Sequence, residues 1–384
     1  MQTTHVFIVD TTTFKYHLEY QFAGTGAKDA RIDFNAKPDS ALSSMAENNL
    51  VSMMSDSQRV REGDYVIFYL QQNKAEGVYE GKFYGIFKVK QAPSFLDNND
   101  NSQYLKYQLK KSLTYRTLIE PYEVYPEGVT EWEALDEIKH IQSPYQMLWS
   151  LIYRKLKGNR GNTMITIYES ERLFKLLRDK NNRQSLRGTN FTLDKQKQII
   201  QTTSEHHNYS GRQEVIDIFP RLKRKYTEGL AFESHLQTYI VQNIGRKTNT
   251  TLDTCLLDTL RLEWLGNEVS CGVGMQRIDV LLDTYKDATT KIIAPIELKA
   301  DEASPDNIYQ LQRYVDWLEQ YYIPNRIGDM QPVLVTLPPS SVDSCNKVVD
   351  ALRQFNARNS RCLPLKYIIY QVQIGMLSFQ QINY

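Results

Sequence analysis

Short apolar runs separated by polar residues dominate the first half of the chain. The clearest lie at residues 6–9, 65–70 and 83–89, between stretches rich in Gly, Asn and Asp. Runs of this length are typical of strands in a small barrel or half-barrel. An apolar helix is expected over residues 169–177. The pattern predicts a β-rich α+β amino-terminal domain over residues 1–178.

Polar residues then replace this pattern. Residues 178–185 are wholly polar, and little hydrophobic pattern returns before Val215. We therefore expect a linker over residues 179–214, holding one short helix at most, and a second domain over residues 215–384.

Helical and strand patterns alternate in the second domain. Helices are expected over residues 230–244, 252–262, 306–321 and 342–356, and strands over 276–282, 293–299, 333–337, 367–372 and 376–382. Strands covered by helices favour an α/β core.

Composition adds limits to this picture. The chain has 384 residues, 41% hydrophobic and 24% charged, which is normal for a globular protein of two domains. Its net charge of +1 means that nucleic-acid affinity would have to come from local basic surface. Basic runs at 154–160 and 221–225 offer such surface, although a solvated helix end or loop explains each equally well.

The four cysteines form no Cys-x-x-Cys pair and have no histidine at zinc-ligand spacing, so we expect neither a zinc site nor a disulfide framework. The amino terminus lacks a signal-peptide pattern, and no apolar run approaches the roughly 20 residues needed to cross a bilayer. These features predict a cytoplasmic protein without a membrane partner.

Candidate chemistry lies in the two strands expected at 276–282 and 293–299. Side chains two apart on a strand share a face, so Glu297 and Lys299 are expected on one side. A turn near Ala288 would place Asp279 opposite Glu297, with Cβ atoms roughly 5 Å apart. Two such carboxylates could hold one divalent cation, but a Glu-x-Lys pair alone also suits any half-exposed strand.

The order of motifs separates these two interpretations. Asp279 comes first, Glu297 and Lys299 follow, and Gln310 and Tyr314 lie on the next helix. This order resembles the PD-(D/E)xK nuclease superfamily. The Gln-x-x-x-Tyr element resembles its RecB-like branch, and the whole run resembles the NucS-type endonucleases. The resemblance implies a restriction-endonuclease-like mixed sheet flanked by helices.

The same resemblance implies a glutamate on an earlier helix. Glu233 lies beside the apolar stripe of the helix expected at 230–244, with Glu228 one turn earlier as the competitor. A solvated helix-surface role is the alternative for both residues.

Each residue of the expected site has an expected role. Asp279, Glu297 and Glu233 would bind Mg²⁺ or Mn²⁺, since hard oxygen ligands select these ions. Lys299 would position the nucleophile or stabilise the phosphate. By resemblance, Gln310 and Tyr314 would orient Lys299 and the phosphate, although Tyr314 also suits a helix core. Arg277 and Arg313 are expected phosphate contacts, or partners in surface salt bridges.

A second, looser resemblance concerns the amino-terminal domain. Residues 63–69, 81–89 and 154–169 resemble PUA-like domains of the EVE and YTH kind, although residues 6–9 lack the expected tryptophan. Such domains hold an unusual or flipped base in an aromatic pocket. The candidates for stacking on a base are Tyr65, Tyr69, Tyr84, Trp132 and Trp149. Burial in the barrel core is the alternative.

Together these features predict an Mg²⁺-dependent DNA endonuclease that acts as a homodimer on double-stranded DNA, with modification-dependent restriction as its biology. A NucS-type mismatch or repair endonuclease and a catalytically inactive nucleic-acid-binding protein are the alternatives, and RNA is not excluded as a substrate. No phosphate loop, HNH site or Gly-x-Ser-x-Gly elbow is present.

Overall fold

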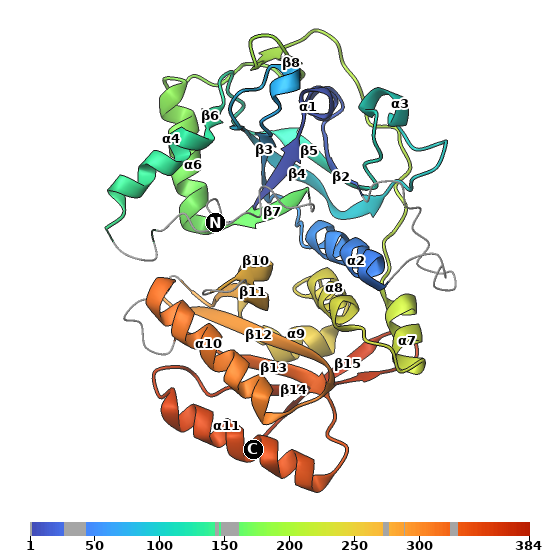
Figure 1. Ribbon diagram of the computed structural model, residues 1–384, viewed down its shortest axis with the longest axis vertical. Coiled ribbons are helices and arrows are strands. Elements are labelled where there is room, and N and C mark those ends of the chain that lie inside the picture. Colours follow the sequence, from blue (N-terminus) through green and yellow to red (C-terminus); the bar gives the residue numbers. More distant parts are fainter. Residues whose placement is uncertain are drawn as a thin grey trace. The chain divides into compact units, whose positions relative to one another are not determined.

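Two compact α/β units make up the chain in the computed structural model, and each is described by itself (Figure 1). The structure describes residues 2–26, 44–142, 146, 161–271, 276–287, 289–322 and 329–384. The amino-terminal unit ends at Ile216 and the carboxy-terminal unit begins at Asp217. None of the helices within these ranges is long and apolar enough to cross a membrane.

The amino-terminal unit is built on a mixed seven-stranded sheet. Its strands are β1 (Thr4–Val9), β2 (Phe22–Thr25), β3 (Tyr65–Leu70), β4 (Lys82–Leu96), β5 (Tyr115–Pro121), β6 (Val129–Thr130) and β7 (Asn162–Ile165). The order is β2-β5-β4-β3-β1-β7 with β6 beside β4, and only β1 and β3 run parallel among these described pairs. The three strands expected from sequence are confirmed in β1, β3 and β4.

Helices surround this sheet. They are α1 (Thr11–Glu19), α2 (Ser44–Gln58), α3 (Lys106–Leu109), α4 (Glu131–Leu135) and α6 (Ile167–Lys180), with 3-10 turns η1 (Lys74–Glu76) and η2 (Asp136–His140). The helix expected at 169–177 is α6, whose start is fixed by a capping box between Thr166 and Glu169.

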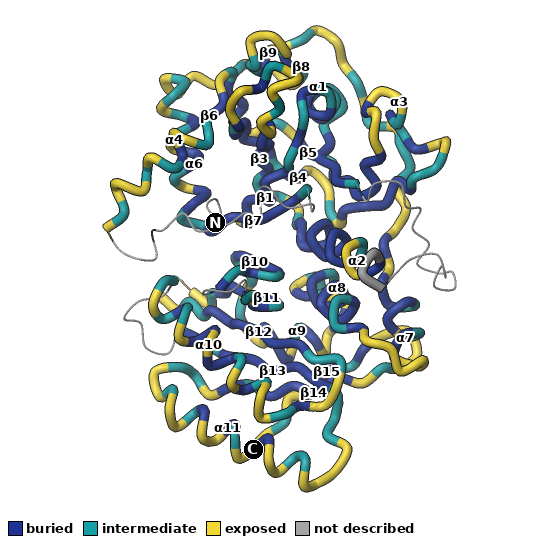
Figure 2. Tube along the Cα trace, viewed as in Figure 1, coloured by how far each residue is buried: buried dark blue, intermediate teal, exposed yellow. Residues whose placement is uncertain are grey.

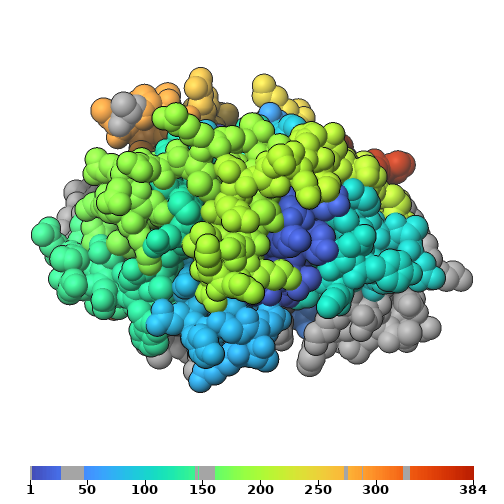
Figure 3. All heavy atoms as spheres, turned by 90° about the horizontal axis from the view of Figure 1, so that it is seen from above, coloured from blue at the N-terminus to red at the C-terminus, as the bar shows by residue number. Residues whose placement is uncertain are grey.

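The segment expected to be a linker belongs to the amino-terminal unit instead. Strands β8 (Phe191–Asp194) and β9 (Ile199–Thr202) form a hairpin whose Phe191, Leu193 and Ile200 are buried in the core with Phe7 and Phe14. Figure 3 shows the yellow-green atoms of this part of the chain beside the dark blue atoms of α1. Each strand has only four residues, so its alternation of apolar and polar residues is too short to identify a strand among polar neighbours.

A mixed six-stranded sheet forms the carboxy-terminal unit. Its order is β10 (Arg261–Ser270), β11 (Arg277–Tyr285), β12 (Lys291–Glu302), β13 (Val333–Leu337), β14 (Lys366–Val372) and β15 (Leu377–Ile382). The β12-β13-β14 pairs are parallel and the other pairs antiparallel. The helices are α7 (Phe219–Thr227), α8 (Glu233–Asn243), α9 (Thr250–Leu256), α10 (Pro305–Tyr321) and α11 (Val342–Arg358). Figure 2 shows the central strands buried and the outer side of α11 exposed.

One expected helix is too long and hides a strand. The helix expected at 252–262 ends at Leu256, and Asp258 adopts a left-handed φ of 52°. The chain then enters β10, where Trp264, Leu265 and Val269 are buried. A backbone in the left-handed region cannot continue a helix, and this conformation leaves no mark in the hydrophobic pattern.

Candidate functional site

The expected hairpin of β11 and β12 is present and has the expected register. Val280 lies opposite Ile296, and continuing this antiparallel register places Asp279 opposite Glu297. Past the last paired residues of the two strands, the Asp279 side chain takes part in the contact: its Oδ2 accepts a hydrogen bond of 2.8 Å from the backbone N–H of Leu298. The Asp279 side chain thus bridges the two strands where the Glu-x-Lys segment begins.

Glu297 is the most deeply buried acid of the candidate site. Its side chain is fully buried, with Oε2 lying 2.7 Å from the hydroxyl of Tyr314. The second oxygen, Oε1, forms an ion pair of 2.6 Å with Lys299 Nζ. A carboxylate oxygen that makes one such contact retains capacity for a further ligand.

Burial sets the ionisation of the three central groups. It raises the pKa of Asp279 well above its usual value, and the charge of Glu297 adds to this shift. Burial also raises the pKa of Glu297, against the lowering effect of Lys299. For Lys299, burial lowers the pKa, but the combined attraction to Glu297, Glu233 and Asp279 outweighs this and the net pKa is raised. Clustered shifts of this kind are typical of functional sites.

Helix α8 brings Glu233 to the same site. Glu233 is the first residue of this helix, and its Oε2 lies 3.5 Å from Lys299 Nζ. Its side chain is 45% exposed. Glu228, the residue after α7, instead pairs with Arg224 of that helix at 2.8 Å. Of the two glutamates, the structure places Glu233 beside Lys299.

Tyr314 connects α10 to both strands of the hairpin. Its hydroxyl lies 2.7 Å from Glu297 Oε2 and 2.7 Å from the carbonyl oxygen of Arg277, and it accepts a hydrogen bond of 2.8 Å from Gln310 Nε2. The structure therefore places Tyr314 against Glu297, where a contact with Lys299 was expected. Tyr314 is also buried, so its core and site interpretations are compatible.

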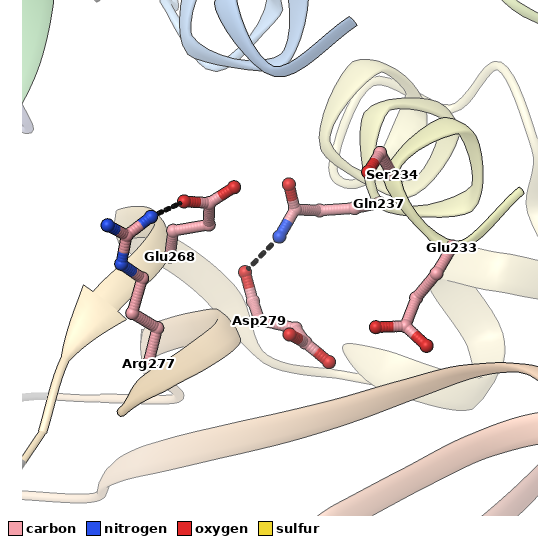
Figure 4. Close-up of a pocket in the computed structure, with 6 residues that line it drawn as sticks. All are labelled: Glu233, Ser234, Gln237, Glu268, Arg277 and Asp279. Carbon is pink, nitrogen blue, oxygen red and sulfur yellow. Dashed lines mark hydrogen bonds and ion pairs between the residues drawn. The ribbon is translucent and has the colours of Figure 1, made fainter. Parts of the chain in front are cut away.

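A cavity of about 360 Å³ opens beside these residues (Figure 4). It is lined by Glu233, Ser234 and Gln237 of α8, Glu268 of β10, and Arg277 and Asp279 of β11. Gln237 Nε2 donates a hydrogen bond of 2.9 Å to the backbone carbonyl of Asp279, and Arg277 forms an ion pair with Glu268.

Three of the cavity-lining residues were not predicted from the sequence, namely Ser234, Gln237 and Glu268. Gln237 lies one helical turn after Glu233, so helical spacing could have identified it. Glu268 lies on β10, a strand that the hydrophobic pattern does not predict. Its position opposite Asp279 on the neighbouring strand could therefore not be predicted.

The other basic candidates are dispersed. Arg313 is exposed on α10 and is not among the residues that line the cavity. Within the run 221–225, Arg221 and Lys225 are buried in α7, which leaves less basic surface than expected. The run 154–160 lies outside the described residues.

The aromatic candidates of the amino-terminal unit have different surroundings. Tyr69 and Tyr84 are fully buried, with hydroxyls bonded to Glu131 Oε2 and to the carbonyl of Gln198, so their rings are not available to a base. Tyr65 is half-buried and packs against Tyr122 with centroids 5.6 Å apart. Trp132 is 65% exposed, and Trp149 lies outside the described residues.

The carboxy-terminal site offers two carboxylates to a hard divalent cation, but not a complete set of protein ligands among the described residues. No group of three or more His, Cys, Asp or Glu side chains in the described part of the chain is close enough to hold a metal ion, and Lys299 lies between Glu297 and Glu233. Asp279 and Glu297 nevertheless offer opposed carboxylates, with Glu297 Oε1 in an ion pair of 2.6 Å with Lys299. Because Mg²⁺ is usually bound through one or two carboxylates together with water and substrate phosphate, this pair suits it.

No model of a known protein family matches the chain, and no curated protein matches it significantly.

Proposed function

We propose that the carboxy-terminal unit is a metal-dependent nuclease of the PD-(D/E)xK type that hydrolyses phosphodiester bonds in DNA. The observation that carries this proposal is the convergence of Asp279, Glu297 and Lys299 at one end of the β11–β12 hairpin, with Glu233 beside the lysine. The mixed six-stranded sheet with helices supports a restriction-endonuclease-like fold.

Each residue has a physical role in this reaction. Lys299 holds its ammonium beside the carboxylates, where it stabilises the negative charge that builds on the phosphate as water adds to phosphorus and the P–O bond to the leaving oxygen breaks. Tyr314 and the Leu298 N–H fix the carboxylates of Glu297 and Asp279. These two carboxylates would hold Mg²⁺ or Mn²⁺, which when bound polarises the phosphate and lowers the pKa of the attacking water.

For the amino-terminal unit we propose recognition of a modified or flipped base, as in PUA-like domains. Its mixed seven-stranded sheet and the exposed ring of Trp132 support this role. Extruding a base costs a few kcal/mol, so a unit that stabilises the extruded base makes cutting depend on that base. The corresponding biology is modification-dependent restriction by a homodimer, which would cut both strands.

The test is cleavage of matched plasmids that carry cytosine, methylcytosine or hydroxymethylcytosine, in Mg²⁺ and in EDTA. We expect Mg²⁺-dependent cutting confined to one modified plasmid. Asp279→Ala and Lys299→Ala are expected to abolish cutting and to leave plasmid binding largely intact. Cutting that survives both substitutions contradicts the site, and cutting of mismatched DNA alone indicates a repair endonuclease. Binding without any cutting indicates an inactive nucleic-acid-binding protein.

A further inference from the structure

A salt bridge on the wall of the cavity has no role in the mechanism above. Asn267 pairs with Val280 and Val269 with Ile278, so Glu268 lies opposite Asp279 on the neighbouring strand. Arg277 precedes Asp279 by two residues on β11, and alternation places both on one face of the sheet. Figure 4 shows Glu268 and Arg277 joined by their ion pair at the cavity.

Arg277 has the geometry of an anion-binding group. Its side chain is 42% exposed, and the ion pair to Glu268 uses Nη1. A guanidinium carries five N–H donors in a planar fork that matches two phosphate oxygens. The carbonyl oxygen of Arg277 contacts the same Tyr314 hydroxyl that contacts Glu297, which fixes the position of Arg277 relative to the carboxylates.

Glu268 has an unusual backbone conformation. Its φ is 48°, in the left-handed region, although the residue lies inside β10. This conformation costs a residue with a side chain roughly 1–2 kcal/mol, and glycine adopts it freely. A glutamate in a strained conformation beside a cavity suggests that its side chain has a function. The ion pair with Arg277 indicates that this function concerns the guanidinium.

We propose that Arg277 binds a backbone phosphate of the substrate next to the one that is cut, and that Glu268 is the positioning residue that holds the guanidinium for it. This inference rests on the proposed nuclease function. Charge favours it, because Glu233 and Asp279 line the same cavity and would repel a phosphate, whereas the charge of Glu268 is paired with Arg277. Of the described lining residues, Arg277 carries the compensating positive charge.

The experiment measures binding of the full-length protein to a short fluorescent DNA duplex by anisotropy, in EDTA and at several salt concentrations. Arg277→Ala is expected to weaken binding about tenfold and to reduce the slope of log K against log salt by about one, the loss expected for one phosphate contact. Arg277→Lys is expected to restore the slope but only part of the affinity, since a lysine lacks the planar fork.

Two further variants separate positioning from folding. Glu268→Gln and Glu268→Gly are expected to weaken binding several-fold, and Glu268→Gly is expected not to lower the unfolding temperature, because glycine relieves the left-handed strain. The matched control is Arg353→Ala, which removes an exposed pair with Asp350 on α11 and is expected to bind as wild type does. Normal or tighter binding by both Glu268 variants, or a lower unfolding temperature for Glu268→Gly, overturns the role of Glu268.

Other outcomes separate this inference from the proposed function. If the wild type cuts DNA while Arg277→Ala binds with wild-type affinity and slope, the phosphate contact is wrong and the nuclease stands. If binding depends on Arg277 but no substrate is cut, the phosphate contact stands and the nuclease is wrong. A wild-type protein that neither binds nor cuts the duplex overturns both.

Discussion

Asp279 and Glu297 oppose each other, Glu297 fully buried and Asp279 half-buried at the cavity, and each has a raised pKa. Burial disfavours the charged carboxylate, and the coupling between neighbouring charges adds to this effect. The folded chain therefore gives up stability at neutral pH to keep two acids together, with Lys299 as partial compensation. A position of this kind favours function over stability.

Asp279→Asn is accordingly expected to raise the unfolding temperature at pH 8 in the absence of divalent cations. The raised pKa means that the native state binds a proton more tightly than the unfolded chain, for which the usual value is 3.8. The stabilisation from this group is complete below that value and is lost as the pH rises through the raised pKa. Asparagine keeps the carbonyl oxygen that accepts from Leu298.

Calorimetry of both proteins between pH 4 and pH 8 checks this expectation. The advantage of Asp279→Asn is expected to shrink as the pH falls toward 4. An advantage that is the same at every pH, or a variant less stable at pH 8, contradicts the assigned direction of the shift.

Tyr314→Phe tests the hydroxyl that joins Glu297 to the Arg277 carbonyl. We expect a loss of about 1–3 kcal/mol in the free energy of unfolding, because buried oxygens lose a donor, and a large fall in the cleavage rate. Tyr322→Phe is the matched control, since the Tyr322 hydroxyl lies 3.1 Å from Asp283 Oδ2 and contacts neither Asp279 nor Glu297. Denaturant unfolding and cleavage rates measure both variants. Equal activities for the two variants would show that Tyr314 is only structural.

Elements with a clear period were predictable. The β11–β12 hairpin has two apolar runs joined by a polar turn, and its residues alternate near Asp279 and Glu297, so the pairing of these two acids followed from the sequence. The contact of Glu233 with Lys299 is long-range, and only the resemblance suggested it. Strand β10 and the β8–β9 hairpin were missed, because a left-handed residue at Asp258 and two four-residue strands leave weak patterns. Glu268 was missed with its strand.

The β8–β9 hairpin gives a prediction at this scale. Phe191→Ala is expected to destabilise the amino-terminal unit by about 3–5 kcal/mol, the usual loss for removing a buried phenyl ring, since Phe191 is only 1% exposed. Val215→Ala is the control, because Val215 is 85% exposed. Thermal unfolding of both variants provides the measurement. If Phe191→Ala is as stable as the control, residues 191–202 do not belong to the core and act as a linker.

Over the whole molecule, the division into two units separates recognition from chemistry in the proposed function. Each unit has its own sheet and its own core, so each is expected to respond separately to a ligand that binds it. Ion binding to the carboxylates would stabilise only the unit that carries them.

Mg²⁺ is therefore expected to raise the unfolding temperature of one transition in calorimetry of the full chain and to leave the other unchanged. The stabilisation grows as RT ln(1 + [L]/Kd), about 2.7 kcal/mol when the ion is present at 100 times Kd. Asp279→Asn is expected to remove most of this response. A shift of both transitions, or an equal shift in the variant, contradicts binding at this pair.

The shared contacts of Tyr314 also bear on how the protein folds. Its hydroxyl meets β11 and β12, its ring lies in the core of the unit, and Glu233 arrives from α8, so the site is complete only after both helices have packed on the sheet. Contacts between residues far apart in sequence form slowly, since the intervening chain must first be closed. In a refolding experiment, the proposed nuclease activity would therefore recover later than secondary structure and would mark the formation of the native state.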